Sequence, residues 1–162
     1  MAYMHLPAKG DRPTVLLLHG KNLNGAHWEQ TAAFLASCGY GVLIPDQIGF
    51  GKFSKPDAYQ YSFNQLAANT ATLMEALEIE KASVIGHSMG GMLAARFALA
   101  YPDWTERLVL VNPIGLEDYL DYTTYPDISE AFEREKALTS ASNSMEQGTS
   151  RTSRTSIGLR KS

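Results

Sequence analysis

The segment from Ser83 to Gly91 constrains the fold of this chain more than any other part of the sequence. It runs from a β-branched apolar stretch through a Gly-x-Ser-x-Gly pattern into a region of small, helix-forming residues. That order predicts a buried strand that turns sharply into a helix, with the hydroxyl of Ser88 at the apex of a strained turn. Gly86 and Gly90 flank the serine because larger side chains would collide with the adjacent strand and helix. We therefore predict that Ser88 is a nucleophile; the alternative is a glycine-rich turn that contains an incidental serine.

Two backbone N–H groups are expected beside this serine. The helix after Ser88 begins with N–H groups that favour developing negative charge, which nominates the N–H of Met89. The strand predicted over residues 14–18 is followed by Lys21 in a loop, and in this architecture that loop supplies a second donor. We predict an oxyanion hole formed by the backbone N–H groups of Met89 and Lys21, with no role for the lysine side chain. Six residues are expected to support the motif: His19, Gly20, Gly86, His87, Gly90 and Gly91.

Short apolar runs alternate with helical patterns through residue 111, which is typical of parallel βαβ units. An edge strand is predicted over residues 2–6 and core strands over residues 14–18, 40–44, 81–86 and 107–111. Helices are predicted over residues 28–37, 62–77 and 90–101. We expect Ser62 to cap the second helix, and Leu93, Phe97 and Ala100 to face inward from the third.

Four segments stand in order along the chain: VLLLHG from Val15, PDQIGFG from Pro45, GHSMGG from Gly86 and LVLVNP from Leu108. Together they resemble the α/β-hydrolase superfamily, in its serine-nucleophile, esterase-like branch, over roughly residues 1–120. The resemblance implies a partial α/β-hydrolase fold, with a mostly parallel sheet flanked by helices and the start of a cap segment. A serine at position 88 separates the chain from aspartate-nucleophile relatives such as epoxide hydrolases and haloalkane dehalogenases. In one departure, Phe53 stands where members commonly carry a serine.

The resemblance also implies a triad in the chain order serine, acid, histidine. Four histidines are present, and all precede the serine: His5, His19, His27 and His87. We expect structural or solvent-exposed imidazoles at these positions, and we expect Asp46 to organise its loop. Asn112 occupies the place at which some relatives carry the acid, and Asp118 and Asp121 are expected to be solvated. We therefore expect the middle of a longer hydrolase, apparently truncated, whose acid and histidine lie in missing sequence.

Residues 1–138 are expected to form one partial hydrolase core with the beginning of a cap, including a helix over residues 128–138. Residues 139–162 include eleven Ser or Thr and almost no large apolar side chains. Such a stretch cannot bury enough surface to offset its ordering entropy, so we predict a disordered basic tail. Missing later strands would leave an apolar sheet edge that invites aggregation.

Composition excludes several classes of protein. A net charge of −3 over 162 residues argues against a nucleic-acid binder. No apolar run approaches the ~20 residues of a membrane span, and no signal peptide is visible, so we expect a cytoplasmic location. The one cysteine, Cys38, excludes an internal disulfide and a multi-cysteine metal site, and we expect a small buried side chain there. No metal or cofactor is predicted, and the oligomeric state is left open.

These patterns predict hydrolysis of small ester-like acyl substrates, of the carboxylic-ester type, by Ser88. Activity is expected to be weak while the triad is incomplete. One alternative is a non-catalytic hydrolase-like module that binds a small hydrophobic ligand or a partner. Another is a different chemistry on the same scaffold, namely C–C bond hydrolysis, amide hydrolysis or perhydrolysis. Five aromatic residues could line an apolar pocket or pack within loops: Phe50, Phe53, Tyr59, Tyr61 and Tyr119.

Overall fold

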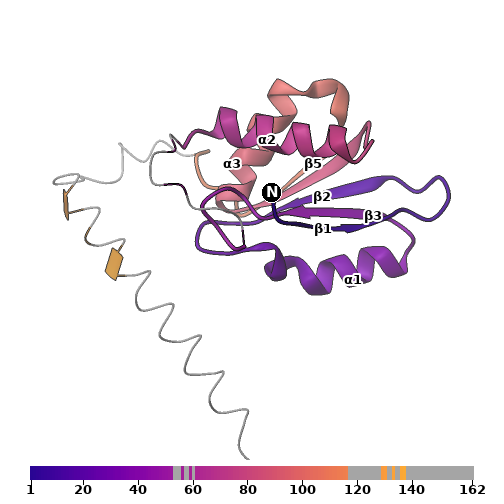
Figure 1. The fold of residues 1–162 in the computed structure, drawn as a ribbon, viewed down its shortest axis with the longest axis horizontal. Helices are drawn as coiled ribbons and strands as arrows, with labels where there is room; N and C mark the ends of the chain where they lie inside the picture. The colour runs from indigo at the N-terminus through magenta and orange to yellow at the C-terminus, as the bar shows by residue number, and fades with distance from the viewer. Residues whose placement is uncertain are drawn as a thin grey trace, which may run out of the picture. The chain divides into compact units, whose positions relative to one another are not determined.

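The computed structural model describes residues 1–52, 56, 59, 61–116, 129, 130, 133, 136 and 137. The elements within these residues follow the predicted alternation of strands and helices (Figure 1). In chain order they are β1 (Tyr3–Leu6), β2 (Thr14–Leu18), η1 (Gly25–Trp28), α1 (Glu29–Ser37), β3 (Gly41–Pro45), α2 (Phe63–Ala76), β4 (Ala82–His87), α3 (Met89–Ala100), η2 (Pro102–Trp104) and β5 (Thr105–Val111). All of them belong to the compact unit Met1–Asp118.

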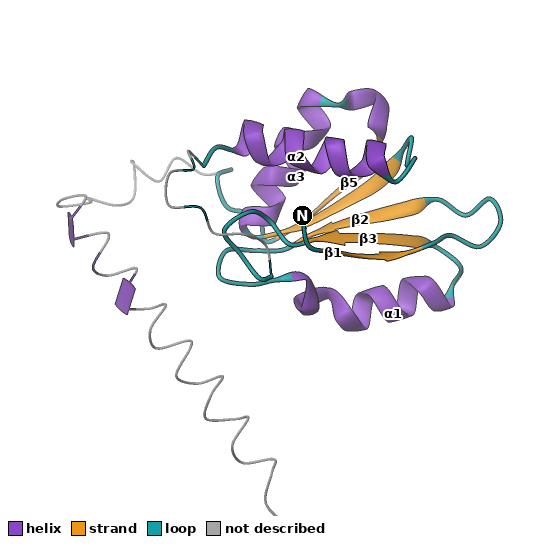
Figure 2. Cartoon of the chain, in the orientation of Figure 1, coloured by secondary structure: helices purple, strands orange, loops and turns teal. Residues whose placement is uncertain are grey.

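The strands form one sheet in the order β1-β3-β2-β4-β5. β1 runs antiparallel to β3, whereas β3, β2, β4 and β5 are parallel neighbours. The helices flank this sheet, with α1 on one face and α2 and α3 on the other (Figure 2). The predicted α/β class, the mostly parallel sheet and the edge strand at the N-terminus are therefore confirmed.

Two apolar cores lie on the two faces of the sheet. Leu16 and Leu18 of β2 point into the core that α2 and α3 cover, and the alternate residues Val15 and Leu17 point into the core beneath α1. This alternation is the two-residue period of a strand. A parallel strand with helices on both faces needs an unbroken apolar run, and the predicted strand over residues 14–18 coincides with β2.

The cap of α2 and most of the inward face of α3 agree with the sequence prediction, and one residue of α3 differs. Ser62 caps α2 as predicted, because its side chain accepts a hydrogen bond from the N–H of Gln65 at 3.1 Å. Phe97 is fully buried as predicted, but Ala100 is exposed, so the prediction for Ala100 was wrong. The ring of Tyr101 packs against Phe97, with centroids 5.2 Å apart, and covers this end of the core instead.

β5 is less buried than a core strand. Within the described residues it pairs with β4 alone, and Leu108, Val109 and Val111 are 40%, 45% and 39% exposed. The expectation of a fourth core strand was therefore wrong for burial, whereas the expected apolar sheet edge is present. Leu110 alone among the apolar residues of β5 packs against the core beneath α2 and α3.

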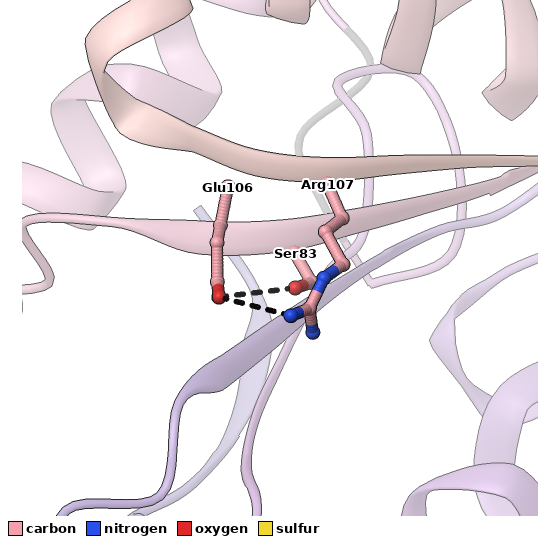
Figure 3. Close-up of polar contacts among 3 residues, drawn as sticks. All are labelled: Ser83, Glu106 and Arg107. Carbon is pink, nitrogen blue, oxygen red and sulfur yellow. Dashed lines mark hydrogen bonds and ion pairs between the residues drawn. The ribbon is translucent and has the colours of Figure 1, made fainter.

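A bulge shapes the beginning of the β4–β5 pair. Ala82 lies opposite Thr105 but Ser83 lies opposite Arg107, so Glu106 is the extra residue. The hydroxyl of Ser83 donates to the Glu106 carboxylate at 3.3 Å, and the Arg107 guanidinium lies 3.7 Å from the same carboxylate (Figure 3). The contact ties the two strands at the end opposite to Ser88.

Cys38 is exposed, so the expected burial of its side chain was wrong. It follows the last residue of α1, where its N–H bonds to the carbonyl of Phe34 at 3.1 Å. The core on this face of the sheet is already occupied by Trp28 of η1 and by Ala32 and Leu35 of α1. The cysteine therefore ends the helix on the solvent side.

Several predictions fall outside the described residues. They concern Phe53, Asp118, Tyr119 and Asp121, most of the cap segment, and the tail over residues 139–162. Within the helix predicted for residues 128–138, the five described residues are helical: Ser129, Glu130, Glu133, Lys136 and Ala137.

Candidate active site

Ser88 stands by itself between strand β4, which ends at His87, and helix α3, which begins at Met89. Its backbone has φ 54° and ψ −118°, a left-handed φ that residues with a Cβ rarely adopt. The strand, the strained turn and the helix thus follow one another in the predicted order. The residue is half-buried, so it is not enclosed within a core.

Hydrogen bonds on both sides hold Ser88 in this conformation. Its N–H donates to the carbonyl of Val111 at 3.0 Å, and its carbonyl accepts from the N–H groups of Gly91 and Ile114 at 2.9 and 3.3 Å. These bonds join the turn to the end of β5, to the loop after it and to the first turn of α3. A strained residue persists only where its surroundings over-determine it, and three bonds from separate segments do so here.

The glycines around Ser88 are required by close backbone approach. A Cβ at Gly86 would overlap the carbonyl of Gly90 and lie 2.8 Å from the Cβ of Ala94. A Cβ at Gly90 would overlap the carbonyl of Leu18 and lie 2.6 Å from that of His19. The expected collisions are therefore present, with helix α3 at the first position and with the end of β2 at the second.

Gly91 allows a third close contact, between α3 and the segment that follows β5. A Cβ there would lie 2.6 Å from the Cβ of Pro113, which follows β5. The doubled glycine thus lets α3 pack against two different strand ends.

The loop after β2 reaches the serine turn. A Cβ at Gly20 would lie 3.2 Å from the Cβ of Ser88 and 3.2 Å from Nδ1 of His87. Lys21 follows directly and is exposed. The structure therefore brings together the two segments in which the oxyanion donors were predicted, the turn at residues 88–89 and the loop at residues 20–21.

His19 is buried between two loops and both its ring nitrogens are engaged. Nε2 accepts from the N–H of Gln47 at 3.0 Å, and Nδ1 lies 2.9 Å from the carbonyl of Gly20, to which it donates in the neutral ring. Burial lowers the pKa of His19, against the opposing effects of the Gly20 carbonyl and of Asp46. A neutral imidazole that links two loops has the structural role expected for this residue.

His27 and His87 form a ring pair beside the serine. Their centroids lie 5.0 Å apart with an interplanar angle of 26°, and Trp28 meets both rings edge-on. Partial burial, and secondarily the neighbouring His87, lower the pKa of His27. Nδ1 of His87 is buried without a hydrogen-bond partner among the described residues. Spacing along the chain carries no sign of this contact, because the two histidines are sixty positions apart.

Asp46 organises the loop after β3, as expected. One carboxylate oxygen accepts from the N–H of Gly25 and the other from the N–H of Lys52, each at 2.7 Å. Asp46 is 9% exposed, so these charge-assisted bonds lie largely out of water. They connect the loop that follows β3 with the start of η1, on the same side of the fold as His27.

An apolar cavity of about 340 Å³ opens next to the serine turn. Its lining residues are Gly49, Phe50, Tyr61, Ser62, Phe63, Leu66 and Met89. Phe50 and Tyr61 belong to the aromatic residues for which pocket lining and loop packing were the two alternatives, and they line this cavity. Phe63, Leu66 and Met89 were missed, because apolar residues at helical spacing predict a core equally well.

Gln47 is a second residue that sequence reasoning missed. It is fully buried, and neither polar atom of its side chain has a hydrogen-bond partner in the described part of the chain. Nothing in the pattern around a glutamine predicts that its amide will be buried.

In the part of the chain that the structure describes, no histidine or carboxylate forms a hydrogen bond with the Ser88 hydroxyl. His5 lies on β1, which β3 and β2 separate from β4. Asn112 follows β5 with φ 42° and is exposed. The described residues also contain no group of three or more His, Cys, Asp or Glu that could hold a metal ion, and no helix among them is long and apolar enough to span a membrane.

Comparison with known proteins identifies hydrolases as relatives of this chain. The family model described as the alpha/beta hydrolase fold matches residues 13–155. A solved structure of a probable hydrolytic enzyme from Pseudomonas aeruginosa PAO1 is 59% identical, with a TM-score of 0.71 over 74% of this chain and 38% of that one.

Two curated relatives carry more specific names. The 2-hydroxy-6-oxo-6-phenylhexa-2,4-dienoate hydrolase of Burkholderia cepacia is 36% identical over 120 residues, which are 70% of this chain and 41% of that protein. Epoxide hydrolase 2 of Siraitia grosvenorii is 34% identical over 107 residues, 65% of this chain and 34% of its own length. The chain therefore spans less than half of the length of the proteins it is compared with here.

Proposed function

This chain belongs to the α/β-hydrolase family, and on that premise we propose that Ser88 is the nucleophile of a hydrolase acting on ester-like acyl substrates. The observation that carries the proposal is the left-handed backbone of Ser88 at the junction of β4 and α3. Strain of this kind is retained at sites where it positions a reacting group. A merely structural turn at this place would be served better by glycine, which adopts the same φ without cost.

In the proposed reaction the hydroxyl oxygen of Ser88 attacks the carbonyl carbon of the ester. The carbonyl oxygen takes up negative charge, which the N–H groups of Met89 and Lys21 stabilise. Met89 is the first residue of α3, so its N–H has no partner within the helix. The close approach of Gly20 to Ser88 supports the second donor. The bond between the carbonyl carbon and the alkoxy oxygen then breaks, and the alcohol leaves with the proton that was taken from Ser88. Water next cleaves the acyl-serine, which releases the carboxylic acid and restores the Ser88 hydroxyl.

This reaction needs a base to take the proton from Ser88. His19 already uses both ring nitrogens in the link between two loops, and His27 and His87 stack on each other. We propose that the base and its acid come from parts of the protein outside these 162 residues. The chain by itself would retain what the oxyanion donors and binding supply, roughly 10³–10⁴-fold over water.

Labelling with a fluorophosphonate probe tests this proposal. The chain and the longest product of its gene are treated in parallel, and the modified peptide is located by mass spectrometry. We expect a single adduct on Ser88, formed faster in the longer product, and no adduct in Ser88→Ala. Ser37→Ala is the matched control, since Ser37 is exposed on α1, and it should label like the wild type. Absence of an adduct at Ser88 in both proteins would overturn the proposal and favour a non-catalytic binding module.

A second candidate is hydrolysis of a carbon–carbon bond on the same scaffold. The likeness to the Burkholderia cepacia dienoate hydrolase favours it. A competition between a p-nitrophenyl ester and a 2-hydroxy-6-oxo-dienoate, followed by product analysis, separates the two chemistries. Turnover of the dienoate in preference to the ester would replace the ester hydrolase with a C–C hydrolase.

A further inference from the structure

The cavity beside Met89 is built from segments that lie far apart in the chain. Gly49 and Phe50 come from the loop after β3, Tyr61 and Ser62 from the approach to α2, and Phe63 and Leu66 from its first turns. Met89 closes the wall and is the residue directly after Ser88. A group bound in this cavity would therefore lie next to a carbonyl held between Ser88 and the N–H of Met89.

The described lining is apolar and uncharged. Phe50, Phe63, Leu66 and Met89 present hydrocarbon or thioether side chains, and no Asp, Glu, Lys, Arg or His is among the described lining residues. The Ser62 hydroxyl already accepts the N–H of Gln65 in the cap of α2. A carboxylate that entered this cavity would lose water and find no cation, and only the hydroxyls of Tyr61 and Ser62 as possible donors, which is unfavourable.

Contacts outside the cavity hold two of its aromatic walls. Phe50 meets the buried ring of His19 edge-on, with centroids 5.7 Å apart. Tyr61 meets Tyr59 edge-on at 4.9 Å and packs against Gly49. A Cβ at Gly49, whose φ is +87°, would lie 2.8 Å from the Tyr61 ring. The shape of the cavity is thus set by the fold before a ligand binds.

We infer that this cavity binds the uncharged acyl group of the ester that Ser88 attacks, a single aromatic ring or an aliphatic chain of similar size. The inference rests on the proposed function for its reaction, although binding itself does not need the serine. The volume of about 340 Å³ is at the lower end of the ~300–1,000 Å³ of ligand pockets. It is large enough to enclose a benzoyl group.

Binding to the Ser88→Ala form of the chain tests the inference without chemistry. Two probes share one ring and one methyl ester: methyl benzoate, which is neutral, and monomethyl terephthalate, which carries a carboxylate on the far side of the ring. Titrations followed by ligand-observed NMR give the two dissociation constants. We expect methyl benzoate to bind at least about tenfold more tightly.

Two substitutions that fill the cavity give an independent test. Leu66→Trp and Phe63→Trp each place a larger ring in the lining, and each should weaken binding of methyl benzoate by about tenfold or more. Phe34→Trp is the matched control, because Phe34 is 66% exposed on α1, and it should leave binding unchanged. Circular dichroism melts establish that each variant is folded. If one filled variant does not fold, the other still decides.

The inference is overturned if monomethyl terephthalate binds as tightly as methyl benzoate, or if a folded filled variant binds like the wild type. It is also overturned if methyl benzoate does not bind saturably. Its failure is distinct from failure of the proposed function. Labelling of Ser88 without ring binding would remove only the acyl pocket, whereas ring binding without labelling of the chain or of the longer gene product would remove only the nucleophile.

Discussion

The imidazole rings of His27 and His87 stack with their centroids 5.0 Å apart. His27 belongs to η1, in the loop after β2, and His87 directly precedes Ser88. The stack therefore joins the two segments that carry the proposed oxyanion donors, Lys21 and Met89. Two positive charges at this separation would repel each other. The lowered pKa of His27, to which the neighbouring His87 contributes after burial, agrees with this repulsion.

Acidification should destabilise the fold through these histidines. Burial lowers the pKa of His19 and of His27 below the ordinary value of 6.5, so the unfolded chain binds more protons than the folded chain as the pH falls below 6.5. Stability then rises with pH through this window and is lost on acidification. We expect the urea midpoint to fall between about pH 7.5 and about pH 5.5.

Two substitutions at His27 show whether the stack contributes. His27→Phe keeps an aromatic ring without a titrating group, so part of the dependence on pH should disappear. His27→Lys places a fixed charge beside His87 and should lower the urea midpoint even at about pH 7.5. An unchanged pH profile in His27→Phe would exclude His27 as a contributor.

The strain at Ser88 can be measured by thermal unfolding of two variants. Ser88→Gly removes the Cβ at φ 54° and should stabilise the chain by about 1 kcal/mol, whereas Ser88→Ala keeps the Cβ and should change stability little. Both variants should lose fluorophosphonate labelling. A glycine variant that is less stable than the alanine variant would show that the turn is not strained in the way proposed.

The elements that could be predicted from sequence are those whose physical requirement is local. A strand buried on both faces needs an unbroken apolar run, as at residues 14–18, and a helix needs a cap, as at Ser62. The glycines at positions 86 and 90 belong to the same class, because a tight turn that places a helix against a strand leaves no room for a Cβ there.

What could not be predicted depends on residues that are distant in sequence. The exposure of β5 is set by which strands flank it, and the cavity beside Met89 is set by loops that lie more than twenty residues away. The same holds for the amide of Gln47, which is buried without a partner among the described residues. Neither periodicity nor a short motif reports such contacts.

Gly90→Ala should destabilise the chain by about 3 kcal/mol, because the added Cβ meets the backbone carbonyls of Leu18 and His19, which cannot move independently. Gly10→Ala is the control. Its φ is +60° but its surroundings are open, so only the cost of a left-handed alanine applies, about 1 kcal/mol. Chemical denaturation measures both. Equal losses would mean that close packing at Gly90 is not the cause.

Asp46→Ala should cost about 2–4 kcal/mol of unfolding free energy, since it removes both charge-assisted bonds to the N–H groups of Gly25 and Lys52. Asp46→Asn keeps one acceptor oxygen and should lose about half as much. Asp103→Ala, at an exposed site in η2, should stay within about 0.5 kcal/mol of the wild type. A loss in Asp46→Ala no larger than that of the control would show that the loop is held by other contacts.

The apolar edge at β5 should make the chain associate with itself. Leu108, Val109 and Val111 are exposed on a strand that pairs with β4 alone among the described residues, and such a strand offers both hydrogen-bonding groups and hydrophobic surface to another chain. Val109→Lys should therefore weaken concentration-dependent association, measured by sedimentation velocity, by about tenfold, because a lysine on an edge strand opposes pairing. Phe34→Lys makes the same change of charge at a 66% exposed site on α1, away from any strand, and should have little effect. If the two lysine variants reduced association equally, net charge and not the β5 edge would be its cause.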